Sequence, residues 1–477
     1  MRLTDLHIRR IFQALTGVMV MVIVVGGFSL FSKEDTRQFA STLTPPPLTK
    51  ETPETRKVKR KKSESQLNNI SETQYEQSLE NLKRESEKDP KNPLLYEQMG
   101  DLFFLKKDFS LAGQSYEIAA LLDAKNMTRQ VKYVRSLLAR RKVIEAERVL
   151  LTLDANDESV LLYRGIVSAF LNKPKDSKVA LSKISQSTNP SLAQQALVVL
   201  NAYTTYESAT DAQPVYLQAL LSRAFNELGE YELSIALGLE AIKQKTDYRD
   251  VWLVIGHSYL SQNMWNDAES ALLKAVSLDA TQSLAHVLLG FTEESLVKPM
   301  EAATHFKKAL DLGYEPAFEI AQKRADNLYE AGVFDEALTA YTDLINKNSA
   351  QLKPEAYIRP MVIYIERQNE PERALELARV LVDTHPDDAT AINLFGWALL
   401  SVGEDGAAED ALNSALARDE KLPAAHLNLG KLSQRRGDLS QALEYYRNAY
   451  TYGTERNDIS ITNAAAALYN AIAKTIN

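Results

Sequence analysis

The chain has 477 residues, no cysteine and a formal net charge of −8. The lack of cysteine excludes disulfides, thiolate zinc sites, iron–sulfur clusters and a cysteine nucleophile. Its 18 glycines and 16 prolines fall well below the average use of about 7% and 5%, which argues against a turn-rich sandwich, barrel or propeller.

The N-terminal part contains one long uncharged run. Residues 11–32 are 22 consecutive residues without a charge, and the centre, residues 18–25, holds only Val, Met and Ile. A membrane-spanning helix needs about 20 mostly apolar residues. We therefore expect one transmembrane helix over 11–32, after a short flank over 1–10. A cleaved signal peptide, whose apolar region is usually shorter, and a buried core helix remain alternatives.

The orientation of this span depends on flanking cations, because Lys and Arg favour the cytoplasmic side. Three cations lie on each side: Arg2, Arg9 and Arg10 before the run, and Lys33, Arg37 and Lys50 after it. Because Arg9 and Arg10 adjoin the run, we expect the N-terminus inside and the C-terminal part outside the cytoplasm. A cytoplasmic C-terminal part remains the alternative.

Residues 33–70 have the composition of a linker, with three consecutive prolines and few large apolar residues. Such a segment buries too little surface to fold alone. It contains six cations within seven residues, namely Arg56, Lys57, Lys59, Arg60, Lys61 and Lys62. This basic run is either a solvated part of the tether or a contact for anionic lipid, wall polymer or nucleic acid.

The remainder of the chain repeats at a fixed period. Gly256 and Gly290 are 34 residues apart, as are Gly396 and Gly430. Aromatic, aliphatic and alanine positions recur around these glycines at constant offsets. Examples are Trp252, Tyr259, Ala268 and Leu272; His286, Ala302 and Phe306; Phe395, Ala408 and Leu412; His426, Ala442 and Tyr446; and, around Gly100, Tyr96, Ala112 and Tyr116.

This pattern resembles the tetratricopeptide repeat (TPR), a helix–turn–helix unit of 34 residues. The resemblance implies an all-α, right-handed superhelical solenoid. We expect N-terminal helical repeats over 71–213, with one clear copy at 92–126 and degenerate copies after it. The main array should then cover 214–456, and a capping helix 457–477, because terminal repeats need a covered apolar face.

Motifs for catalysis are absent from the sequence. It contains no phosphate-binding glycine loop, no H-E-x-x-H and no nucleophile elbow. The six histidines are dispersed, and His286 and His426 occupy the packing offset of Trp252. We therefore expect no enzyme activity, no cofactor, no metal site and no small-molecule substrate.

The resemblance also implies a binding surface, since helix A of each repeat lines the concave face. The expected partner-binding residues are Tyr216, Arg223, His257, Phe291, Arg359, Arg367, Asn393, Trp397, Lys431 and Arg435. Exposed aromatics such as Phe291 and Trp397 commonly anchor a bound peptide, although Trp397 could equally pack against a neighbouring helix. The Lys and Asn positions that clamp a C-terminal carboxylate in some TPR proteins are not kept here, where Leu253 and His257 stand.

The charge divides unevenly along the chain. Residues 1–70 hold 12 cations and 6 acids, whereas the remainder holds 43 cations and 57 acids. An acidic solenoid argues against nucleic acid as its ligand. The sequence thus predicts a membrane-anchored scaffold that binds a protein or peptide partner, in the assembly of a cell-envelope complex. A regulatory or substrate-carrying subunit of an enzyme complex and an adhesion or polymer-binding module remain alternatives.

Overall fold

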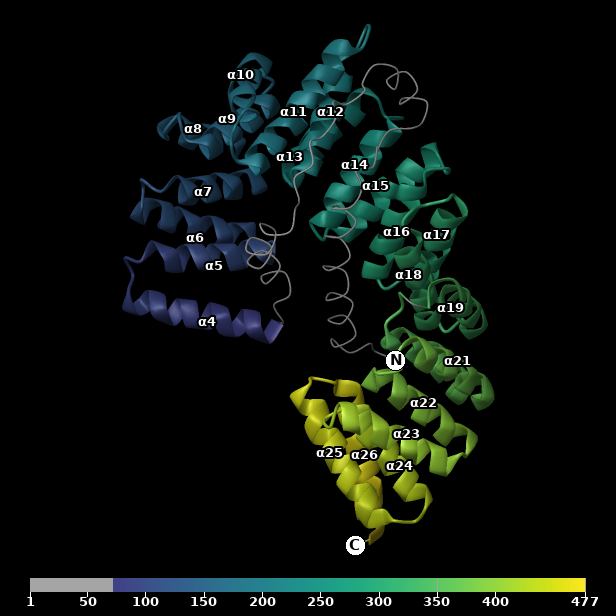
Figure 1. Ribbon diagram of the computed structural model, residues 1–477. Coiled ribbons are helices and arrows are strands. Elements are labelled where there is room, and N and C mark those ends of the chain that lie inside the picture. The colour runs from purple at the N-terminus through teal and green to yellow at the C-terminus, as the bar shows by residue number, and fades with distance from the viewer. Residues whose placement is uncertain (1–71, 350, 477) are drawn as a thin grey trace. The chain divides into compact units, whose positions relative to one another are not determined.

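The computed structural model describes residues 72–349 and 351–476. The predicted membrane span over 11–32, the linker and the basic run lie outside these residues. Among the helices of the described residues, none combines the length and the apolar character that a membrane crossing requires. Every regular element in this part of the chain is helical (Figure 1).

The chain divides into two compact units, one up to Leu312 and one from Gly313. The helices of the first unit are α4 (Glu72–Lys88), α5 (Pro93–Leu105), α6 (Phe109–Leu122), α7 (Met127–Ala139), α8 (Val143–Thr152), α9 (Glu158–Phe170), α10 (Pro174–Ile184), α11 (Pro190–Ser208), α12 (Pro214–Glu227), α13 (Tyr231–Gln244), α14 (Arg249–Ser261), α15 (Trp265–Leu278), α16 (Ser283–Ser295) and α17 (Pro299–Asp311).

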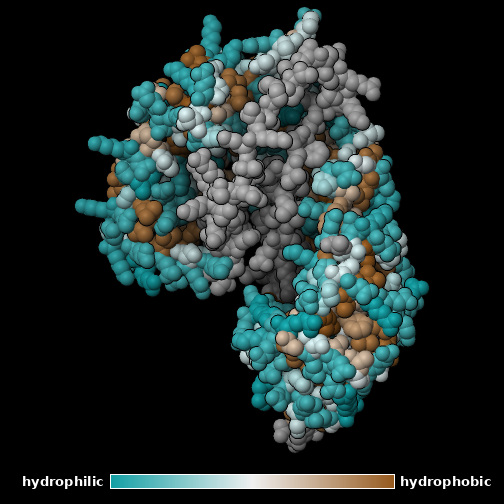
Figure 2. All heavy atoms as spheres, in the orientation of Figure 1, coloured by the Kyte–Doolittle hydropathy of each residue, from teal (hydrophilic) through white to brown (hydrophobic). Residues whose placement is uncertain are grey.

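The second unit contains α18 (Ala317–Glu330), α19 (Phe334–Asn348), a 3₁₀ turn η1 (Pro354–Tyr357), α20 (Ile358–Val362), a π-helical turn η2 (Ile363–Gln368), α21 (Pro371–Thr384), α22 (Ala389–Val402), α23 (Asp405–Arg418), α24 (Pro423–Arg435), α25 (Leu439–Glu455) and α26 (Ile459–Ile476). Most consecutive helices pair as antiparallel hairpins, so each unit is a stack of helical repeats. On the face shown in Figure 2, the described residues are mostly hydrophilic, with hydrophobic positions scattered among the polar ones.

Local sequence starts many of these helices. The side chains of Asn92, Asp108, Asn126 and Asp157 accept hydrogen bonds from backbone N–H groups of the first turn of α5, α6, α7 and α9. These caps satisfy donors that have no partner within the helix. Pro93 follows Asn92 as the first helical residue of α5, where its missing N–H costs nothing.

In six of the hairpins the crossing of the two helices is set by a glycine on the first helix. A Cβ atom added at Gly290 would lie 2.5 Å from the Phe306 ring, and one at Gly430 would lie 2.5 Å from the Tyr446 ring. The same contact recurs with a constant spacing of 16 residues in four further pairs: Gly100 and Tyr116, Gly165 and Leu181, Gly256 and Leu272, and Gly396 and Leu412. The large side chain therefore fills the space between the two helices, as the sequence predicts.

A small residue four positions before the offset of the large side chain completes the packing, although that offset holds Gly238 and Ala378 in two of the hairpins. The small residue has no solvent-exposed surface in any of ten hairpins, where it is Ala112, Ala146, Ser177, Ser234, Ala268, Ala302, Ala337, Ala374, Ala408 and Ala442. In the α9–α10 hairpin Ser177 takes the alanine position, and its hydroxyl donates a 2.9 Å hydrogen bond to the Gly165 carbonyl.

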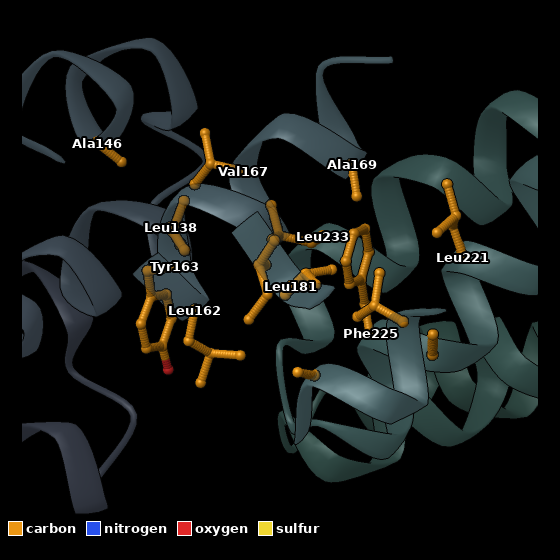
Figure 3. Close-up of a cluster of buried hydrophobic side chains, with 14 of the residues drawn as sticks. Leu138, Ala146, Leu162, Tyr163, Val167, Ala169, Leu181, Leu221, Phe225 and Leu233 are labelled. Atoms are coloured by element: carbon orange, nitrogen blue, oxygen red, sulfur yellow. The ribbon is translucent and has the colours of Figure 1, made fainter. Parts of the chain in front are cut away.

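The first unit departs from a simple stack between α7 and α13. One hydrophobic cluster runs through all the helices from α7 to α13, with Leu138, Leu181 and Phe225 fully buried (Figure 3). The first residues of α13 return to α7, where Arg141 pairs with Glu232 at 2.6 Å across 91 residues of sequence. Residues 127–213 therefore pack as part of a compact bundle, and the helices of this bundle contact more than their sequence neighbours.

The C-terminal helix α26 covers the last repeat. Ala465 and Ile472 are buried in one cluster with Tyr446 of α25 and Leu427 of α24. At the other end, Leu79 and Leu82 of α4 pack against the first repeat. Both ends of the described chain thus close an apolar face that would otherwise meet water.

Replacing Gly290 by Leu should destabilise the α16–α17 hairpin, because the new side chain must displace the Phe306 ring. We expect a loss of about 1–3 kcal/mol, the usual cost of overpacking, measured as lost amide-exchange protection in this hairpin. Gly406 in α23 is the matched control, because an added Cβ there meets no atom within 4 Å. Its replacement by Ala should leave protection unchanged or raise it. Equal protection in the Gly290 variant and the wild type would contradict the packing role.

Candidate partner-binding surface

Among the predicted partner-binding residues, His257 belongs to a chain of buried and part-buried hydrogen bonds. It lies on α14, and its Nδ1 is 3.0 Å from Asn226 Oδ1 on α12. Asn226 Nδ2 donates to Ser258 Oγ at 2.8 Å, and Ser258 Oγ donates to Ser234 Oγ at 3.0 Å. Because the Asn226 amide oxygen can only accept, Nδ1 of His257 carries the proton. The lone pair of the imidazole is therefore on Nε2.

The charge state of His257 follows from its surroundings. Burial lowers the pKa of His257 to about 4, since desolvation disfavours the imidazolium. The ring is accordingly neutral at pH 7. A neutral imidazole of fixed tautomer offers one hydrogen-bond acceptor and no positive charge.

The other predicted residues of the first unit are more enclosed than the sequence suggests. Tyr216 and Arg223 on α12 are half-buried, and burial lowers the pKa of Arg223. Phe291 on α16 is only 5% exposed, and its ring packs edge-on against Phe306 at a centroid distance of 5.3 Å. Phe291 therefore contributes to the hairpin core. The expectation of an exposed anchor at this position is wrong, because the ring turns toward its own hairpin.

In the second unit two arginines lie over aromatic rings. Arg359 on α20 bonds Glu330 at 2.8 Å and also pairs with Asp326, and its guanidinium lies 5.2 Å from the Tyr329 ring centre. Arg367, in the π-helical turn η2, is exposed and lies 5.3 Å from the centre of the Phe334 ring. A π-helical turn is rare and is found often at functional sites.

The neighbouring helices supply the remaining positions. Asn393 on α22 is 2% exposed and accepts a 3.1 Å hydrogen bond from Asn428, so it is a buried link between α22 and α24. The expectation that Asn393 contacts a partner therefore does not fit its burial. Trp397 on the same helix is half-buried. Its packing thus leaves part of the indole accessible.

Two cations on α24 differ in their surroundings. Burial lowers the pKa of Lys431, and the Glu366 carboxylate opposes this shift. Arg435 is exposed, donates to the Leu400 carbonyl at 2.9 Å and pairs with Asp405. Arg435 thus already has two partners, whereas the charge near Lys431 is the Glu366 carboxylate.

Two features of the first unit were not identified from the sequence. Buried Glu230 accepts a 3.0 Å hydrogen bond from Tyr163 and lies 3.7 Å from Arg135. Burial raises the pKa of Glu230, and Arg135 and Tyr163 oppose that shift. These residues come from α7, α9 and the turn before α13, so only the long-range packing of α13 on α7 brings them together.

The second such feature is an open cavity of about 530 Å³ in the same region. It lies between the α7–α8 turn, the end of α9 and the start of α13, and its lining includes Ile144, Phe170 and Leu233. The residues that line this cavity form no sequence pattern that indicates a cavity.

Within the described residues, no three His, Cys, Asp or Glu side chains form a group that could hold a metal ion. The predicted anionic-surface contact over residues 56–62 lies outside the described residues and stays a prediction.

No protein-family model matches the chain, and no curated protein does. Among solved structures, yeast Tom70 is 14% identical and has a TM-score of 0.29, over 80% of this chain and 98% of Tom70. YrrB, described as a TPR protein with an unusual peptide-binding site, is 18% identical with a TM-score of 0.27, over 48% of this chain and 97% of YrrB. The TPR2AB domain of yeast Sti1, in complex with pHSP90, is 16% identical with a TM-score of 0.25, over 54% of this chain and 98% of that domain.

Such low TM-scores do not establish a common fold. The repeat architecture of this chain rests on its own helix packing, above all on the glycine contacts that recur in six hairpins.

The imidazole of His257 should not titrate between pH 8 and pH 5. Because its pKa is about 4, the neutral imidazole contributes fully to the stability of the folded state above about pH 6.5, the usual pKa of histidine in an unfolded chain. This contribution is lost as the pH falls toward 4. Histidine NMR on selectively labelled protein measures the titration. Asn226→Asp should raise the pKa of His257, because a carboxylate stabilises the imidazolium. A midpoint above pH 6 in the wild type would contradict the assignment.

Proposed function

We propose that this chain is a scaffold that binds a protein or peptide partner along the surface formed by the first helices of its repeats. One observation carries the proposal. Trp397 on α22 and Lys431 on α24 occupy the same repeat offset, 34 residues apart, and both are partly accessible, whereas Ile363 at that offset on η2 is buried. An accessible aromatic and an accessible cationic side chain thus follow one another in successive repeats.

The chemistry of this row suits an extended peptide. Trp397 keeps part of its indole accessible, and large aromatic side chains are frequent energetic centres of protein interfaces. Lys431 on α24 and the exposed Arg367 in η2 add positive charge on the first helices of the neighbouring repeats. A segment with an apolar side chain followed by a carboxylate would match both features. An acidic solenoid with a local cationic row also disfavours nucleic acid, whose phosphates would meet mostly acidic surface.

We further propose that residues 11–32 anchor the chain in a membrane and that the solenoid works outside the cytoplasm, in the assembly of a cell-envelope complex. The support is the 22-residue uncharged run and the two arginines that adjoin its N-terminal end. The linker over 33–70 would let the solenoid reach partners at some distance from the bilayer.

Site-specific photocrosslinking tests the binding surface in intact cells. A photoreactive residue in place of Arg367 should yield one discrete protein adduct. The same residue in place of Arg447, an exposed arginine on α25, should yield none. Adding Trp397→Ala should reduce the adduct at position 367 at least tenfold, because loss of an anchoring aromatic typically costs about 2 kcal/mol or more of binding energy.

An unchanged amide-exchange profile must accompany the Trp397→Ala result, so that lost binding is separated from lost folding. Equal adducts at positions 367 and 447, or no effect of Trp397→Ala, would overturn the binding proposal.

Cell fractionation tests the anchor. The full chain should remain in the membrane pellet after alkaline carbonate extraction, whereas a variant without residues 11–32 should move to the supernatant. Protease added to intact spheroplasts should degrade the solenoid of the full chain. Release of the full chain by carbonate would contradict the anchor, and protection from protease would contradict the orientation.

A further inference from the structure

Three titratable side chains meet inside the α16–α17 hairpin. His286 Nδ1 lies 2.9 Å from His305 Nδ1, and the two rings stack at a centroid distance of 5.1 Å. On the outer side of each ring, His286 Nε2 lies 3.1 Å from the Ala280 carbonyl oxygen, and His305 Nε2 lies 3.4 Å from Glu293 Oε1. His286 is 4% exposed and Glu293 also 4%. The row therefore begins at the turn before α16, passes through His286 on α16 and His305 on α17, and ends at Glu293 on α16.

The donors in this row can be assigned in sequence. A carbonyl oxygen only accepts, so Nε2 of His286 carries a proton. A neutral His286 then has its lone pair on Nδ1, so Nδ1 of His305 must donate. A neutral His305 in turn has its lone pair on Nε2, and the remaining donor is the protonated carboxyl of Glu293. The last contact, at 3.4 Å, is long for a hydrogen bond and is the weakest of the three.

Three contacts thus require three protons. The same number is kept if Glu293 is ionised and His305 is doubly protonated, since the proton only moves along their contact. A fourth proton on His286 would place N–H against N–H across 2.9 Å. With only two protons, one contact has two acceptors and no hydrogen. Loss of a proton therefore breaks a contact. A fourth proton on His305, beside a neutral Glu293 that accepts through Oε1, keeps the contacts but leaves a buried positive charge without a counter-ion in the row, which is costly.

We propose that His286, His305 and Glu293 form a pH-sensitive latch that joins α16 to α17 near neutral pH and releases them when the row gains or loses a proton. The second oxygen of Glu293 is buried and has no hydrogen-bond partner. Burial of an unpartnered carboxylate oxygen is costly when it is charged, which favours the neutral acid in the latch.

Charged groups around the latch act in both directions. Glu269 on α15 and Glu301 on α17 oppose ionisation of Glu293, and Lys298 before α17 favours it. Lys308 on α17 opposes protonation of His286, whereas Glu269 favours protonation of His305. Burial is the largest influence on all three latch residues.

These shifts fix the sign of the pH dependence. Burial lowers the pKa of both histidines, so their stabilising contribution is lost as the pH falls below the unfolded value near 6.5. Burial raises the pKa of Glu293 to about 8. The contribution of a protonated Glu293 is complete only below its unfolded pKa, and it is lost as the pH rises through 8. The hairpin should be most stable near pH 6–7 and weaken on both sides.

The chain itself contains two matched hairpins for comparison. In α24–α25, His426 and Tyr445 occupy the repeat offsets of His286 and His305, and His426 Nε2 bonds the Glu420 carbonyl at 2.9 Å. This hairpin has one buried histidine and, at the offset of Glu293, Ser433. In α22–α23 the histidine offset is occupied by Ile392, so that hairpin has no such histidine.

Amide exchange of the full chain, followed by mass spectrometry from pH 5 to pH 9, tests the latch. After correction for intrinsic exchange, protection of α16–α17 relative to α22–α23 should fall on both sides of neutrality, by up to about tenfold per pH unit for each proton involved. The α24–α25 hairpin should show the acid fall alone. A ratio that is flat from pH 5 to pH 9 would overturn the latch.

Two variants separate the acid fall in protection from the alkaline fall. Glu293→Gln supplies an amide donor to His305 Nε2 without a titratable proton, so it should remove the alkaline fall and keep the acid fall. His305→Tyr copies the pair found at His426 and Tyr445, so it should leave only a weaker acid fall. An alkaline fall that persists in Glu293→Gln would overturn the latch even if His305→Tyr does not fold. Failure of the proposed partner binding would leave these results unchanged, because the measurement needs no ligand.

Discussion

The contact between a glycine on one helix and a large side chain 16 residues later is the constraint on which this structure depends. It brings the two helix axes close enough for a single ring or isobutyl group to fill the crossing, and it leaves no room for a Cβ atom. Because the spacing is constant in six hairpins, each hairpin presents the same faces to its neighbours. The positions available for binding are therefore set by the hairpin packing.

Where this contact changes, polar chemistry enters the interior. In the hairpin α12–α13, Ser222 stands at the glycine offset and Gly238 at the offset of the large residue. Ser222 donates to the Ser234 carbonyl at 2.8 Å, and hydrogen bonds continue through Ser258 and Asn226 to His257. A buried polar group must be paired to be tolerated, so this exchange of a large side chain for small polar ones also fixes the tautomer of His257.

The sequence identifies the faces of the helices better than it identifies the accessibility of single residues. Trp397 and Arg367 lie at inner-face offsets and keep accessible surface, as expected, whereas Phe291 and Asn393 lie at comparable offsets and are buried. An offset determines the direction of a side chain from its helix. Whether that side chain meets solvent depends on the neighbouring helix and on the size of the residue opposite. The offset specifies neither of these.

The sequence by itself determined the period, the hairpin as the repeating unit, the glycine and alanine positions and the terminal helices, because these depend on local spacing along one or two helices. Only the tertiary structure decided the return of α13 to α7, the burial of Glu230 beside Tyr163, and the row formed by His286, His305 and Glu293. The physical reason is distance along the chain. Contacts between side chains from separate helices depend on how whole hairpins pack, and no short spacing in the sequence records that.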